Sequence, residues 1–191
     1  QGYLAEALFN YLVRLGWSHG DTEVFTREQL VEVFDLDQVG KKGSIFDSKK
    51  LQWLNGVYLR AKSSEELLCS LDLIDGKYRK NLQAVWPAQE LDALLTLYKE
   101  RAVTLIELYE AVYACAVVPT SYDVSLIAKW QTAQTPAMLQ AFINQASALA
   151  VFDHDALAAC ANAVCTEFTA KLVALAQPLR LALTGGTVSP G

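Results

Sequence analysis

The chain has 191 residues, of which 52% are hydrophobic and 19% are charged, and its formal net charge is −5. This composition is typical of a globular protein and excludes an intrinsically disordered one. The length allows one domain or two small ones, with a core that needs neither disulfides nor metal. No apolar run is long enough to span a membrane, and the first residues are not a signal peptide.

Helical spacing of apolar residues dominates the first part of the chain, beginning with Tyr3 to Leu15. Thr26 and Ser63 each precede a Gln or Glu by three positions, which is the capping-box pattern of a helix start. Asp47 precedes a further helix with one apolar face and is a candidate N-cap. We therefore predict four helices before residue 75.

The remainder of the chain is also predicted to be helical. Pro87 suits the first position of a helix, and Thr104 begins another capping box in a helix that Pro119 ends. Shorter helices are predicted over residues 121–132 and 136–150. Asp153 is expected to cap a long alanine-rich helix that ends before Pro178.

No strand pair or hairpin signal is present, so the predicted fold is all-α. The apolar pattern is interrupted between Asp75 and Pro87, and we predict a division of the chain in this stretch. The last residues, from Thr184 to Gly191, are predicted to form a loop.

Residue patterns for catalysis or metal binding are missing from the sequence. The four cysteines lie in apolar stretches without C-x-x-C spacing, so we expect them to be core thiols. They are Cys69, Cys115, Cys160 and Cys165. His19 and His154 suit a turn and a helix start, and neither has the spacing of a catalytic triad or of a metal site. These features predict a helical binding module.

Positive charge is concentrated in one segment of this acidic chain. Between Lys41 and Lys80 there are nine basic and five acidic residues, so the segment carries +4 and the rest carries −9. Such a segment is compatible with local phosphate contact and equally with an ordinary solvated surface.

Four motifs in order resemble those of bacterial glutamyl-tRNA synthetases. They are GYLAEALFNYLVRLGWS at Gly2–Ser18, FDSKKLQWLNGVY at Phe46–Tyr58, ERAVTL at Glu100–Leu105, and PLRLALTGG with SPG at 178–186 and 189–191. The segment between Tyr109 and Lys171 matches mainly in its helical character.

The resemblance implies a class I synthetase that activates glutamate with ATP and Mg²⁺ and transfers it to tRNA(Glu). The Rossmann domain of the family precedes these motifs, and the chain lacks an initiator Met, so we expect a fragment that is inactive alone and holds no cofactor itself. The expected parts are a stem-contact domain over residues 1–75 and an anticodon-binding domain over residues 76–191. The resemblance further implies a cytoplasmic monomer without a DNA or membrane partner.

Two arginines and the end of the chain are the expected anticodon contacts. Arg101 matches the arginine with which discriminating members of the family recognise the third anticodon base, a task that suits a planar guanidinium. Arg180, Ser189 and Pro190 match the second anticodon contact, where a proline face can support an unstacked base. The alternatives are a helix salt bridge for Arg101 and a helix end with a polar tail for the others.

Three residues of the second motif are the expected contacts to the tRNA stem. Lys50 would bind phosphate, and Asn55 would bind a sugar or phosphate oxygen, which positions tRNA without reading its sequence. Trp53 suits a core position and an RNA contact equally well. A helical protein-interaction module without RNA binding remains the alternative function for the whole chain.

Overall fold

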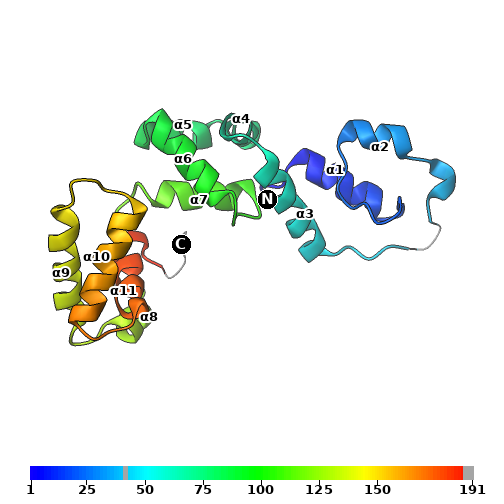
Figure 1. Ribbon diagram of the computed structural model, residues 1–191. Helices are drawn as coiled ribbons and strands as arrows, with labels where there is room; N and C mark the ends of the chain where they lie inside the picture. The colour runs from blue at the N-terminus through cyan, green and yellow to red at the C-terminus, as the bar shows by residue number, and fades with distance from the viewer. Residues whose placement is uncertain (41–42, 187–191) are drawn as a thin grey trace. The chain divides into compact units, whose positions relative to one another are not determined.

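The computed structural model describes residues 1–40 and 43–186 (Figure 1). These residues form helices and the connections between them, and their only strand-like pairing is an isolated bridge between His19 and Thr22. The predicted all-α fold is therefore confirmed. Among the described residues, no helix is long and apolar enough to cross a membrane.

The chain divides into two compact units, and the first is Gln1–Ala116. Its described elements are α1 (Ala5–Arg14), α2 (Arg27–Val33), the 3-10 turn η1 (Leu36–Gln38), α3 (Ser48–Ala61), α4 (Ser64–Ile74), α5 (Lys77–Val85), α6 (Ala88–Tyr98) and α7 (Leu105–Ala114).

Side-chain caps fix the starts of several of these helices, as predicted. Thr26 and Ser63 form complete capping boxes with the residues three positions later, and Asp47 accepts hydrogen bonds from the first two lysine N–H groups of α3. Thr104 caps α7, but the Glu107 carboxylate accepts from the N–H of Val103, one residue before the N–H that a complete capping box would use. Each cap satisfies helix N–H groups that have no partner within the helix.

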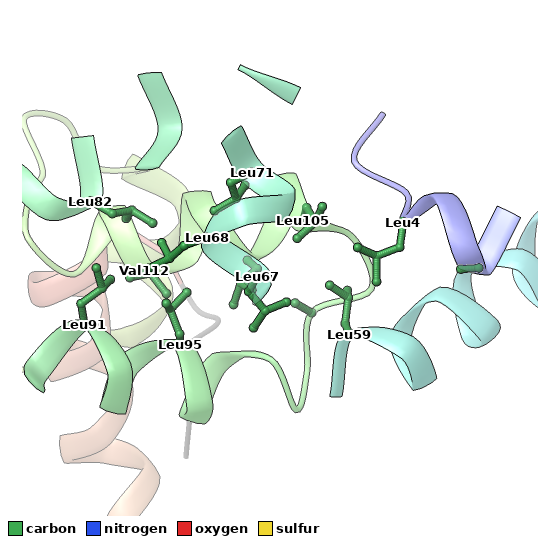
Figure 2. Close-up of a cluster of buried hydrophobic side chains, with 13 residues drawn as sticks. Leu4, Leu59, Leu67, Leu68, Leu71, Leu82, Leu91, Leu95, Leu105 and Val112 are labelled. Atoms are coloured by element: carbon green, nitrogen blue, oxygen red, sulfur yellow. The ribbon is translucent and has the colours of Figure 1, made fainter. Parts of the chain in front are cut away.

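The main core of the first unit gathers buried leucines from α4, α5, α6 and α7 together with residues near α1 and α3 (Figure 2). Leu67, Leu71 and Leu82 are completely buried in it. Burial of one such side chain stabilises the fold by about 1.5–3 kcal/mol.

The expected interruption between Asp75 and Pro87 is itself mostly helix α5, whose Leu82 belongs to this core. The compact units separate instead between Ala116 and Val117. The division at residue 75 therefore does not coincide with a gap in packing, and its functional meaning stays a prediction.

The second unit begins at Val117 and contains α8 (Val124–Trp130), α9 (Thr135–Ser147), α10 (His154–Glu167) and α11 (Leu172–Thr184). Its core is formed by Met138, Val164, Cys165 and Leu175. These side chains come from α9, α10 and α11, which pack against one another.

The prediction of one long helix between Asp153 and Pro178 is wrong. Asp153 caps α10 as expected, but that helix ends at Glu167, where Thr169 follows with a positive φ of 51°. A new helix then continues through Pro178, which is buried. Proline removes one backbone hydrogen bond within a helix, and burial of its ring in the unit offsets part of this loss.

Two of the four thiols also differ from expectation. Cys160 and Cys165 are buried, whereas Cys69 and Cys115 are exposed. The described residues contain no group of three His, Cys, Asp or Glu side chains that could hold a metal ion.

Candidate nucleic-acid interface

Arg101 lies on the short connection between α6 and α7 and is exposed. The backbone N–H groups of Arg101 and Ala102 both donate to the Tyr98 carbonyl at 3.1 Å. Ala102 is buried, and Leu105 donates its N–H to the Gly2 carbonyl at 2.8 Å. The turn that carries Arg101 is therefore fixed on both sides by buried residues and backbone hydrogen bonds.

Asn55 strengthens this anchoring from helix α3. Its side-chain Oδ1 accepts from the Leu4 N–H at 2.8 Å, and its Nδ2 donates to the Val103 carbonyl at 2.6 Å. Asn55 has an exposed fraction of 0%. Both polar atoms are thus bonded inside the protein, and the buried side chain is not accessible to a sugar or phosphate oxygen.

This position of Asn55 changes its expected part from a tRNA contact to a support for the Arg101 turn. The sequence held a signal for it, because Asn55 shares the apolar face of its helix with Leu51, Leu54 and Leu59. A polar residue on an apolar face must find partners in the core.

Lys50 and Trp53 are at the surface of α3. The Lys50 ammonium lies 2.5 Å from Oε1 of Glu23, and Nη2 of Arg14 lies 3.7 Å from the same oxygen. The hydrogen bond from Lys50 holds the pKa of Glu23 below its ordinary value. Trp53 is 47% exposed, so its side chain lies partly against the protein and partly in solvent.

Four of the seven described cations of the basic segment, Lys50 among them, are paired with acids. Lys62 pairs with Glu6 at 2.6 Å and Lys77 with Asp75 at 2.7 Å. Arg79 contacts two carboxylates, those of Glu65 and Asp72.

The cations of this segment that form no ion pair with described residues are Lys49, Arg60 and Lys80. Lys41 and Lys42 lie outside the described residues. Within the described part of the segment, the positive charge without an ion pair is therefore limited to these three side chains.

Arg180 belongs to the second unit and lies on α11, where it is partly buried. Its carbonyl accepts from the Thr184 hydroxyl at 2.9 Å. The helix ends at Gly185, which has a φ of 70°, a conformation that glycine adopts without steric cost. Ser189 and Pro190 lie outside the described residues, so their expected contact to the anticodon stays a prediction.

An exposed guanidinium on a rigid turn is suited to binding the edge of an unstacked base, because its planar fork offers several donors in fixed directions. Comparison with known proteins identifies the family of the chain. Residues 64–191 match the family described as "Anticodon binding domain". The chain belongs to this family.

Residues 1–53 match a second family, the catalytic domain of class I tRNA synthetases for E and Q. The described residues of the matched part contain α1, α2, η1 and the start of α3. The chain is 41% identical to a glutamate–tRNA ligase of Syntrophobacter fumaroxidans over 191 residues, which cover all of this chain and 40% of that protein. It is 42% identical to a ligase of the same name from Azorhizobium caulinodans, covering 99% of this chain and 41% of that protein.

Solved structures agree with the sequence comparison. A glutamate tRNA ligase from Elizabethkingia meningosepticum, crystallised in complex with its amino acid, matches with a TM-score of 0.84 and 26% identity over 99% of this chain and 37% of that chain. The resemblance to bacterial glutamyl-tRNA synthetases, predicted from four motifs, is thereby confirmed. The chain spans about two fifths of the length of the curated relatives it matches.

Proposed function

We propose that this chain binds tRNA(Glu) and recognises its anticodon as part of a glutamate–tRNA ligase. The observation that carries the proposal is the exposed Arg101 on an anchored turn, within a chain that belongs to an anticodon-binding family. A bidentate contact between arginine and a base edge contributes about 1–3 kcal/mol of discrimination. Arg101 is proposed to supply this at the third anticodon base and so to reject the glutamine tRNA.

Residues 1–75 would then support the stem of the tRNA, with Lys50 and Trp53 as contacts, and residues 76–191 would bind the anticodon loop. Arg180, Ser189 and Pro190 are proposed to complete the anticodon site. The whole ligase would join glutamate to tRNA(Glu) with ATP and Mg²⁺, and we propose that it acts as a cytoplasmic monomer.

Fluorescence anisotropy of labelled tRNA(Glu) with the 191-residue chain, across a salt series, tests this function. Phosphate contacts release counterions, so the logarithm of the binding constant is expected to fall linearly with the logarithm of salt concentration. An unrelated tRNA serves as the control and is expected to bind more weakly at each salt concentration. Equal binding of both tRNAs would contradict anticodon recognition, and no binding at low salt would favour a protein-interaction module.

A further inference from the structure

Arg14 and Lys50 meet at one carboxylate although they come from different helices. Arg14 lies in the last turn of α1, and Lys50 lies in the first turn of α3, which packs against α1. Oε1 of Glu23 lies 2.5 Å from the Lys50 ammonium and 3.7 Å from Nη2 of Arg14. Two cations therefore share a single counter-charge.

The position of Glu23 is fixed by its backbone. Asn10, which is completely buried, donates from Nδ2 to the Glu23 carbonyl at 2.9 Å and accepts from the Phe25 N–H at 2.7 Å. The segment that carries Glu23 is thus held against α1, and the carboxylate is kept beside both cations.

Arg14 has donor capacity that the protein does not use. Its side chain is only 15% exposed, and its Nη1 is buried without a hydrogen-bond partner in the described part of the chain. A buried donor without a partner costs about 1–3 kcal/mol. A ligand that accepts a hydrogen bond from this guanidinium would remove that cost.

A pocket of about 170 Å³ lies beside these groups and is lined by Arg14, Ser44, Asp47 and Lys50, among others. Its volume is several times the ~30 Å³ of one water molecule in the liquid. Asp47 brings an opposing charge, but its Oδ1 accepts from the N–H groups of Lys49 and Lys50 as the helix cap. Glu23 is thus the carboxylate that pairs directly with the cations of the pocket.

We propose that Arg14 and Lys50 form a site for one phosphate group of the RNA backbone, and that Glu23 holds both cations in position until the phosphate replaces it. This inference rests on the proposed function and names a phosphate contact of the stem-binding part. Guanidinium and ammonium groups are the usual protein partners of phosphate. Because Glu23 competes with the phosphate, it lowers the affinity for RNA.

The test compares four variants of the 191-residue chain in binding labelled tRNA(Glu) across a salt series. Glu23→Gln is expected to bind about 2- to 5-fold more tightly, because the phosphate no longer has to break a surface ion pair. The matched control is Glu65→Gln, which removes the acid of the exposed Arg79 pair on the same unit and is expected to leave affinity unchanged. Arg14→Gln and Lys50→Gln are each expected to weaken binding roughly 3- to 10-fold and to reduce the salt slope by about 1.

A second readout separates the backbone phosphate from free phosphate. The side-chain Nε–Hε resonance of Arg14, identified by its loss in Arg14→Gln, is followed by NMR during titration with tRNA and with inorganic phosphate at constant ionic strength. A shift with tRNA supports the site, and a shift with both probes shows that it accepts phosphate from either source.

The inference is overturned if Glu23→Gln binds tRNA no more tightly than Glu65→Gln and the Arg14 resonance responds to neither probe. If tRNA binding is then still lost on Arg101→Ala, the proposed function stands without this phosphate site. If the parent chain does not bind tRNA at all, the proposed function fails, and the response of Arg14 to inorganic phosphate decides on the site by itself.

Discussion

Replacement of Asn55 with alanine removes two hydrogen bonds that join α3 to the chain's beginning and to the connection before α7. The Leu4 N–H and the Val103 carbonyl both lose their side-chain partner. Each buried polar group left without a partner costs about 1–3 kcal/mol. We therefore expect Asn55→Ala to lower the free energy of unfolding by about 2–6 kcal/mol, a large share of the ~5–15 kcal/mol typical of a folded protein.

Urea denaturation followed by circular dichroism, without RNA, measures this loss. The matched control is Gln52→Ala on the same helix, where the side chain is exposed and the expected change is within about 0.5 kcal/mol. If Asn55→Ala unfolds at the same urea concentration as Gln52→Ala, Asn55 does not support the Arg101 turn.

Three further changes test other parts of the structure. Leu67→Ala should lower the free energy of unfolding by about 2–5 kcal/mol in the same urea assay, because the leucine is completely buried; a loss below 1 kcal/mol would contradict the packing described. Hydrogen bonds from Ser63 lower the pKa of Glu66 in the folded chain below its ordinary value of 4.5. The ionised Glu66 carboxylate therefore stabilises the fold above pH 4.5, and this stabilisation is lost as the pH falls through the pKa of the folded chain. The parent should therefore lose more stability than Glu66→Gln between pH 6 and pH 3 in thermal melts, and parallel losses would refute this. Trp53→Ala should weaken tRNA binding by roughly 5-fold or more, as expected for loss of an aromatic base or sugar contact, while the urea midpoint stays near that of the parent; an unchanged affinity would remove Trp53 from the interface.

Local signals in the sequence were sufficient for the helix starts. Thr26, Asp47, Ser63 and Asp153 all cap helices as predicted, because capping depends on one side chain and the N–H groups two or three positions later. Local rules failed where tertiary packing decides. Pro178 continues a helix because its ring is buried in the second unit.

Helix α5 shows the same limit. Its segment contains three basic residues and is mostly polar, yet Leu82 places it in the main core. Whether a single leucine in a polar stretch is buried depends on helices far away in the sequence, which periodicity does not report.

The candidate site was predictable in part. The resemblance located Arg101 and Lys50 without any structure, and both are on the surface of the first unit. It did not distinguish Asn55, which supports the turn from inside, from residues that face solvent. The connection between Arg14, Glu23 and Lys50 was not predictable either, since it depends on the packing of α1 against α3.

The most direct test of anticodon recognition is a double-mutant cycle between Arg101 and the third anticodon base of tRNA(Glu). Affinities are measured for the parent chain and Arg101→Ala, each with the natural tRNA and with the base-swapped tRNA. If Arg101 binds this base, the swap weakens the parent by about 1–3 kcal/mol and has little further effect on Arg101→Ala, so the two changes are not additive. Fully additive losses would show that Arg101 and the base act independently, which contradicts the proposed anticodon contact.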